Sequence, residues 1–179
     1  MSDWKLLNTT NASSSASVEF TSVTGYKIFK WAFTNVHASN TTVDLQIAFS
    51  TDGGSSYGVT KTTTFFRAAH KQNGTNAFSY QTGHDLAQST SAQHISRDIG
   101  TDADHNICGE IFLFNPASTT YTKHFYGRST AAHSVDLFIY DSYFGGYANT
   151  TSAINACKFT LSAGTIDAGI FKQYGLVST

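Results

Sequence analysis

The chain has 179 residues with a formal net charge of -1, and only 13% of its residues are charged. The charges form no run and no apolar stretch approaches the ~18 residues of a membrane span, so the sequence predicts neither a nucleic-acid partner nor a membrane partner. The length suits one domain with a single core. Cys108 and Cys157 have no zinc or redox spacing, which indicates buried free thiols.

The first sixteen residues differ from the rest of the chain. Trp4, Leu6 and Leu7 precede a low-complexity run, NTTNASSSAS. Two interpretations are open: an N-terminal arm, residues 1–16, whose apolar side chains dock on a neighbouring subunit, or a frayed terminus or first edge strand. The segment lacks the apolar core and basic start of a secretory signal, which favours folding in a cytosol.

From residue 17 onward, strand signals alternate with turn residues, and no segment has the apolar period of a helix over three turns. Val43, Leu45 and Ile47, for example, alternate with polar or small residues, so one face of that strand is expected in the core. We therefore expect an all-β domain, residues 17–179, that forms an antiparallel two-sheet sandwich, preferably a jelly roll. The expected strands are 17–23, 26–36, 43–51, 59–69, 109–115, 122–129, 135–143, 153–161 and 164–176.

Residues 72–106 interrupt this strand pattern with a long polar insertion. Loops longer than ~12 to 15 residues are usually functional or flexible, so a specialised contact with a partner is expected here first. One short helical turn is predicted around the letters HDLAQ, residues 84–88.

Residues 50–57, STDGGSSY, are similar to the Asp-box turn of sialidases and other β-propellers. The pattern occurs once, whereas a propeller needs ~4 to 8 four-stranded blades and repeats the box in each. We interpret Asp52, Gly53 and Gly54 as a structural tight turn onto which Tyr57 packs. The turn is expected to close a hairpin that fixes the register of the preceding strand.

Two patterns in the insertion offer metal ligands. Asp102, Asp104 and Asn106 alternate as in a calcium loop, but the Gly and Glu positions of an EF-hand are absent, so a solvated loop is the favoured interpretation. His84, His94 and His105 could hold zinc if the insertion folded back on itself, but their spacing matches no metal signature and surface histidines are favoured. No cofactor is predicted.

The sequence contains no nucleophile elbow, no HExxH helix and no signature around either cysteine, so no catalytic residue is predicted and the chain is expected to be non-enzymatic. Among the aromatic residues, Tyr140, Tyr143 and Tyr147 in YDSYFGGY are candidate glycan contacts. Core or turn packing of these rings is the favoured interpretation.

Three segments, taken in order, resemble β-rich structural proteins encoded by tailed phages, particularly marine ones. GYKIFKWAFTNVHASNTTVDLQIAFSTDGGSSY resembles a recurring hairpin of that group, EIFLFNPASTTYTKHFYGRST its next hairpin, and GTIDAGIFKQYGL its closing strand. The similarity covers roughly residues 20–175 apart from the insertion. Each motif is common by itself, and their order carries the resemblance.

This resemblance implies a virion structural protein with a β-sandwich fold and no catalytic residues. Such a protein is a capsid decoration or cement protein, or a related tail or fibre component, assembled in the host cytoplasm with major capsid or tail proteins as partners. We expect a homotrimer or another symmetric oligomer, because sandwich edges and the arm need covering. The alternatives are a carbohydrate-binding module, such as a receptor-binding fibre head, and a small glycan-degrading enzyme.

Overall fold

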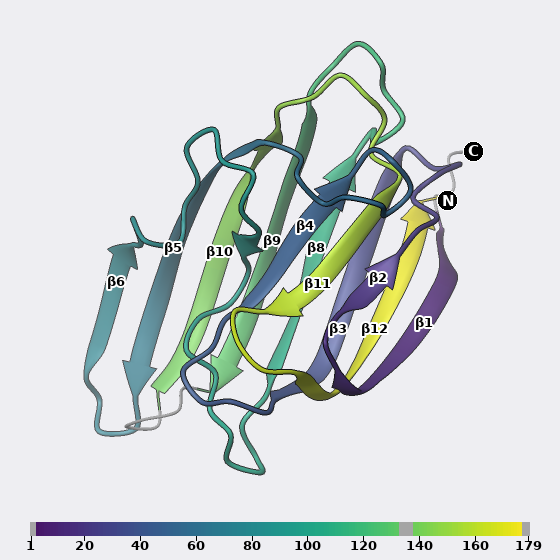
Figure 1. Cartoon of the computed structure of the whole chain (residues 1–179). Helices are drawn as coiled ribbons and strands as arrows, with labels where there is room; N and C mark the ends of the chain where they lie inside the picture. Colours follow the sequence, from purple (N-terminus) through teal and green to yellow (C-terminus); the bar gives the residue numbers. More distant parts are fainter. Residues whose placement is uncertain (1–2, 133–137, 177–179) are drawn as a thin grey trace.

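The computed structural model describes residues 3–132 and 138–176, which form twelve β-strands in two antiparallel sheets and contain no helix (Figure 1). The expected all-β sandwich is confirmed. The preferred jelly-roll version has eight strands in two Greek keys. The sandwich differs from it, because its sheets hold eight and four strands and β8, β9 and β10 follow one another as a meander.

The large sheet has the strand order β1-β12-β3-β8-β9-β10-β5-β6, and the small sheet has the order β2-β11-β4-β7. The strands of the large sheet are β1 Trp4–Ser15, β3 Ile28–Ala38, β5 Lys61–Lys71, β6 Asn76–Tyr80, β8 Ile107–Phe114, β9 Lys123–Ala132, β10 Phe138–Ala148 and β12 Ile166–Leu176. Those of the small sheet are β2 Val18–Phe20, β4 Leu45–Ser50, β7 Gln93–His94 and β11 Ala156–Leu161. The strand expected over residues 135–143 is β10, and residues 135–137 lie outside the described part.

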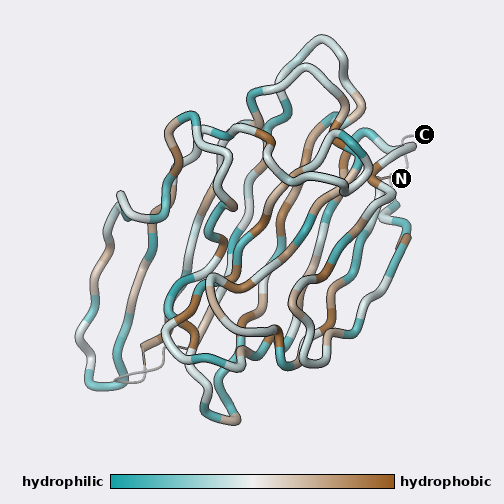
Figure 2. The backbone as a smooth tube through the Cα atoms, in the orientation of Figure 1, coloured by the Kyte–Doolittle hydropathy of each residue, from teal (hydrophilic) through white to brown (hydrophobic). Residues whose placement is uncertain are grey.

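The core lies between the two sheets and is built by alternation along each strand. Phe29, Trp31 and Phe33 of β3 turn inward and are fully buried. Phe159 of the small sheet meets Phe33 with ring centroids 6.2 Å apart. Figure 2 shows the most apolar segments within the strands, while the connections are mainly hydrophilic. This pattern explains why β-branched and aromatic residues at every second position specify a sandwich here.

Residues 4–15 form an edge strand of the large sheet. Of the two interpretations of the N-terminal segment, the structure therefore agrees with the first edge strand and not with a separate arm. β1 pairs antiparallel with β12 from Trp4, opposite Leu176, to Ser15, opposite Ile166. Leu7 packs against the core, whereas Trp4 and Leu6 are exposed. The segment therefore belongs to the sandwich, and residues 1–2 of the expected arm lie outside the described residues.

The polar insertion is not a single loop, because parts of it are built into the sandwich. Its first part forms β6, which pairs with β5, and a later part forms β7, which pairs with β4. Gln93, Ile95 and Ile99 are fully buried. The insertion thus covers the inner side of the large sheet where the four-stranded sheet ends.

Hydrogen bonds explain why the helical turn expected over residues 84–88 does not form. Leu86 exchanges backbone and side-chain hydrogen bonds with Thr63 of β5: its N–H donates to Thr63 Oγ1 at 2.9 Å, and its carbonyl accepts from Thr63 N–H at 2.9 Å. Gln93 Nε2 donates to the carbonyl of His84 at 2.9 Å. The N–H of Gln88 donates to Thr62 Oγ1 at 3.2 Å. The carbonyl of His84 and the N–H of Gln88, which a one-turn helix would pair with each other, thus both have partners outside the segment.

Lys61 and Lys123 are both fully buried, and neither has an ion pair with a carboxylate among the described residues. Lys61 at the start of β5 is fully buried, and its Nζ donates to the carbonyl of Val59 at 2.7 Å. Burial disfavours the charged ammonium and lowers the pKa of Lys61 from 10.5 to about 8. The alternation of β5 places this residue inward, in register with the buried Thr63 and Phe65.

Candidate functional site

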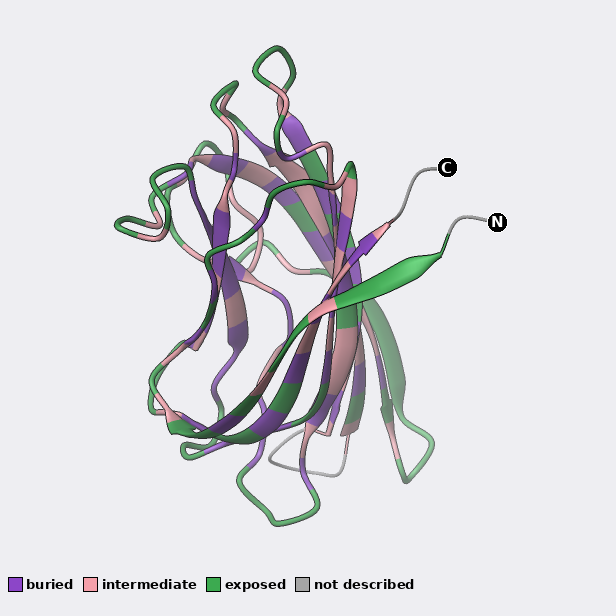
Figure 3. Cartoon of the chain, turned by 90° about the vertical axis from the view of Figure 1, so that its right-hand side faces the viewer, coloured by how far each residue is buried: buried purple, intermediate pink, exposed green. Residues whose placement is uncertain are grey.

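The large sheet turns one face toward the small sheet and leaves the other, here called the outer face, open to solvent. In β9, His124, Tyr126 and Arg128 are exposed on this face between buried neighbours, and Figure 3 shows the same banding along the sheet. Large apolar side chains that are more than a third exposed gather there. They are Trp4, Leu6, Phe78, Tyr80, Tyr126, Ile139 and Ile170.

Two groups of aromatic rings stand on the outer face. In the first, Tyr126 of β9 lies against Phe112 and Phe114 of β8, with ring centroids 5.3 and 5.5 Å away. In the second, Phe66 of β5 stacks on Tyr143 of β10 at 5.1 Å with an interplanar angle of 7°. These separations are close to the ~4.8 Å spacing of neighbouring strands, so the rings stand up from the sheet and cover one another's faces.

A charged pair lies between the two aromatic groups. Arg128 Nε and Nη2 donate to the two carboxylate oxygens of Asp141 at 2.7 and 2.6 Å. The Arg128 guanidinium also lies 5.1 Å from the ring centre of Tyr143, whose hydroxyl donates to Asp141 at 3.1 Å. The charges of the pair are thus satisfied within the chain, which leaves an aromatic surface with a fixed polar centre.

The three candidate glycan tyrosines do not share a platform. Tyr140 is buried on the inner side of β10, with the Arg67 guanidinium 4.0 Å from its ring centre. Tyr143 stands in its ring stack on the outer face, and the hydroxyl of Tyr147 accepts a hydrogen bond from Gln88 at 3.2 Å. Because Tyr140 and Tyr143 are three residues apart on one strand, they face opposite sides of the sheet, which corrects the grouping.

The STDGGSSY turn is held by its own side chains. Ser50 Oγ donates to Asp52 Oδ1 at 2.6 Å and accepts from the backbone N–H of Gly54 at 3.0 Å. Asp52 also accepts from the backbone N–H of Ser56 at 2.9 Å and from its hydroxyl at 2.6 Å. Hydrogen bonds from Ser50 and Ser56 lower the pKa of Asp52 from 3.8 to about 2.

The hairpin expected at this turn is not formed. The turn follows β4 of the small sheet and leads toward β5 of the large sheet, so it crosses between layers, and β4 pairs with β11 and β7 instead. Tyr57 closes over Gly54 and donates its hydroxyl to Glu19 at 3.1 Å. Gly53 and Gly54 both have positive φ, as a tight turn requires.

The calcium-loop pattern does not converge on one point. The carboxylates of Asp102 and Asp104 approach His105 Nε2 at 3.8 and 3.9 Å. Asn106 turns its Oδ1 toward the Cys108 thiol at 3.5 Å. Asp102 and Asp104 thus share His105 as a neighbour while Asn106 turns to Cys108, so the three side chains do not converge on a position for a shared cation. Cys108 is only half-buried, so the expectation of two buried thiols holds for Cys157 alone.

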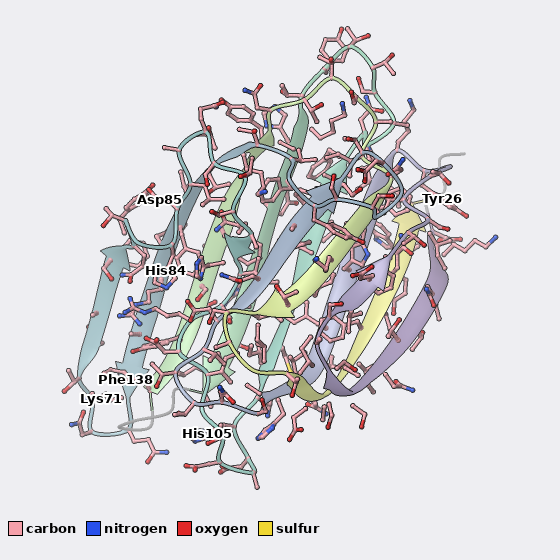
Figure 4. The ribbon with its side chains drawn as sticks, viewed as in Figure 1. Tyr26, Lys71, His84, Asp85, His105 and Phe138 are labelled. Carbon is pink, nitrogen blue, oxygen red and sulfur yellow. The ribbon has the colours of Figure 1, made fainter. Side chains whose placement is uncertain are left out.

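A cluster of potential metal ligands does occur within the described residues, at Asp44, His84 and His94. Asp44 Oδ2 lies 3.1 Å from His84 Nε2 and 2.8 Å from His94 Nδ1, and the three ligand atoms all lie within 4.8 Å of one another. Figure 4 shows His84 beside β5, consistent with the 5.3 Å between its ring centre and that of Phe65.

The Asp44 carboxylate is stabilised as an anion. Burial favours its neutral form, but hydrogen bonds from His84, from His94 and from the backbone N–H of Asp98 outweigh burial and hold the pKa of Asp44 well below its usual range. Sequence analysis singled out His84 and His94 but grouped them with His105 and missed Asp44. No spacing signal joins Asp44 to His84, because only the pairing of β4 with β7 brings the insertion to this strand.

The fold defines an antiparallel β-sandwich with an aromatic outer face and a cluster of the buried Asp44 with the half-buried His84 and His94. Among the described residues there is no helix long and apolar enough to cross a lipid bilayer. No protein-family model, curated protein or solved structure matches the chain.

Proposed function

We propose that this chain is a non-enzymatic structural component of a tailed-phage particle that binds another protein of the particle through the outer face of its large sheet. It acts as a capsid decoration or cement protein, or as a related tail or fibre component, and assembles in the host cytoplasm. The order of the three resembling segments supports the phage assignment, and the outer face supports the mode of binding.

The observation that carries the proposal is the exposed aromatic character of the outer face. Trp4 on the edge strand β1 of the large sheet is 37% exposed, Tyr126 on the inner strand β9 is 53% exposed, and Phe78 on the opposite edge strand β6 is 72% exposed. Large exposed apolar surfaces on a folded chain mark interaction sites. Tryptophan, tyrosine and arginine are also the residue types that carry most binding energy at protein interfaces.

The orientation of the rings favours a protein partner over a sugar. A sugar ring stacks flat on an open aromatic face, whereas Phe66 and Tyr143 cover each other's faces at 5.1 Å. Tyr126 likewise lies against Phe112 and Phe114. The edges of such rings and the clefts between them suit interdigitating side chains of a protein.

Because a particle offers many equivalent binding sites, a modest affinity at each outer face is sufficient for stable attachment. A decoration protein binds many equivalent sites, and a symmetric oligomer binds several at once, so its avidity exceeds the affinity of each face. We expect a homotrimer or another closed oligomer, to be measured by sedimentation equilibrium of the full chain. A strictly monomeric chain at particle-binding concentrations would remove this part of the proposal.

The test has two stages. In the first, mass spectrometry must detect the chain in purified particles. Absence of the chain from the particles would contradict the virion assignment. The double variant Trp4→Ala, Tyr126→Ala is then compared with wild type for retention on particles that lack the native chain.

We expect the double variant to bind at least about 30-fold more weakly, because the loss of even one interface hot spot costs about 2 kcal/mol or more. Tyr121→Ala is the matched control, since Tyr121 is 69% exposed but lies in the loop between β8 and β9. Unchanged retention of a folded double variant would overturn the assigned surface. Binding of wild type to a glycan array, lost in Tyr126→Ala, would favour the carbohydrate-binding alternative instead.

A further inference from the structure

The Asp44 cluster is held by a frame of fixed hydrogen bonds. Asp44 precedes β4, and Ser162 fixes its backbone by accepting from Asp44 N–H at 3.0 Å and donating to its carbonyl at 2.9 Å. His94 lies on β7 opposite Gln46 of β4. The backbone of His84 is fixed by the buried Gln93, as described above. The three side chains therefore converge from ordered elements, as a binding site requires.

The donor set is that of a zinc-type ion. Two imidazole nitrogens and one carboxylate oxygen are ligands that Zn²⁺ binds at ~2.0 to 2.2 Å, which places ligand atoms about 3.3 Å apart in a tetrahedron. The Asp44 oxygen already lies 3.1 Å from His84 Nε2 and 2.8 Å from His94 Nδ1. Small side-chain shifts therefore open the space for an ion.

The charge of the cluster points the same way. The side chain of Asp44 is only 10% exposed. Its carboxylate meets two imidazoles and, through Oδ1, the backbone N–H of Asp98 at 2.7 Å. None of these groups carries a fixed positive charge, and a buried carboxylate is normally paired with a cation or a metal. A divalent ion at Oδ2 supplies that charge.

We propose that Asp44 Oδ2, His84 Nε2 and His94 Nδ1 bind a divalent transition-metal ion of the zinc type, which fastens the insertion to the small sheet. Three protein ligands leave the fourth position of a tetrahedral ion for water. The role is independent of the outer face, because the cluster lies with the insertion and β4, while the outer face is the opposite side of the large sheet.

Binding changes the positions of protons in a defined way. Without an ion, Nδ1–H of His94 and Nε2–H of His84 donate to Asp44, and Gln46 Nε2 lies 3.2 Å from His94 Nε2 as its donor. With an ion, both ligand nitrogens present lone pairs, so each neutral ring carries its proton on the other nitrogen. The Gln46 amide then turns its oxygen to accept from His94 Nε2–H, the outer hydrogen bond that metal-ligating histidines usually make.

The test uses the full chain without an affinity tag, freed of metal by dialysis against a chelator. Zn²⁺ is titrated by calorimetry, and Co²⁺ is added in parallel to record the visible absorption of a four-coordinate site. We expect one ion per chain. His84→Gln and His94→Gln each lower the affinity for Zn²⁺ by more than about 100-fold, a larger loss than outer hydrogen-bond partners cause.

His124→Gln is the matched control, because His124 is exposed on the outer face and should leave Zn²⁺ affinity unchanged. Failure of wild type to bind Zn²⁺ saturably, or equal binding by the His94→Gln variant, overturns the proposal. If the variants do not fold, ¹⁵N NMR of the wild-type imidazoles decides. Zn²⁺ must then shift the ring nitrogens of His84 and His94 and leave those of His124 in place, and any other pattern rejects the site.

Discussion

The ring of Phe144 on β10 lies directly over the backbone of Gly127, its cross-strand partner on β9. A Cβ atom on Gly127 would lie 2.5 Å from Phe144 Cζ and would also strike the carbonyl of Glu110. Phe33 and Gly109 repeat this arrangement between β3 and β8. In both pairs the aromatic ring fills the space that the missing side chain leaves, which is why glycine stands inside these strands.

Gly127→Ala is therefore expected to lower the free energy of unfolding by about 1 to 3 kcal/mol, the usual cost of overpacking a core. Chemical denaturation monitored by fluorescence measures the change. Gly83→Ala is the control, because a Cβ there meets nothing within 4 Å, and its effect should stay within about 0.5 kcal/mol. Equal stability of the two variants would show that the sheet adapts to a side chain at Gly127.

Lys61 predicts a rise of stability with pH. The pKa of Lys61 is about 8 in the folded chain, whereas an ordinary lysine, as in the unfolded chain, has a pKa of 10.5. Between pH 8 and pH 10.5 the unfolded state therefore binds more protons than the folded state, and the free energy of unfolding increases as pH rises. From pH 7 to pH 9 the expected gain is on the order of 1 kcal/mol.

Lys61→Met should remove this gain and be more stable than wild type at pH 7, because no charge is then desolvated. Lys5→Met, at an exposed position of β1, should keep the wild-type profile. Unfolding curves at several pH values compare the three proteins. A Lys61→Met profile parallel to that of wild type would contradict the burial argument.

Asp52→Ala should lower the melting temperature, because Ser50 and Ser56 lose their shared acceptor and the turn between the sheets loosens. The pKa of Asp52 is lowered from 3.8 to about 2 in the folded chain. The contribution of its carboxylate to the stability of the fold is therefore complete above pH 3.8 and is lost as pH falls toward about 2. The difference between wild type and variant should therefore shrink in acid. Asp104→Ala, at an exposed residue, serves as control, and a loss of partner binding without a loss of stability would indicate a functional turn instead.

The two thiols should react at very different rates. Cys157 is fully buried, and burial raises its pKa well above the usual value, whereas Cys108 is half-buried beside Asn106. A maleimide reagent at pH 7.5 should label Cys108 first and Cys157 only on unfolding. Mass spectrometry of peptides from briefly treated protein measures this order, and early labelling of Cys157 would show that the core opens locally.

Much of the fold follows from local pattern. The alternation of Leu45, Ile47 and Phe49 predicted β4, and β12 was likewise predicted near its observed bounds. β6 was missed because four of its five residues are exposed, so no buried face marks it. β7 is two residues long and is defined only by its partner β4.

The candidate sites were less accessible to sequence analysis. Lys61 resembles any charged strand residue until the register turns it inward. Asp44 and His84 meet only because the insertion folds onto the small sheet, and no spacing rule encodes that contact. The outer face depends on which side of each strand the small sheet covers, which is a property of the assembled sandwich.

The strand order also sets the time at which the protein can fold. β12 lies between β1 and β3, and β11 lies between β2 and β4, so the two last strands occupy inner positions of the two sheets. During synthesis, β1 and β2 stay without their partners β12 and β11, which are made more than a hundred residues later. Such long sequence separations slow folding and leave apolar strands open to wrong pairing meanwhile. Removing β12 should therefore leave a nascent chain that chaperones retain, rather than a slightly smaller sandwich.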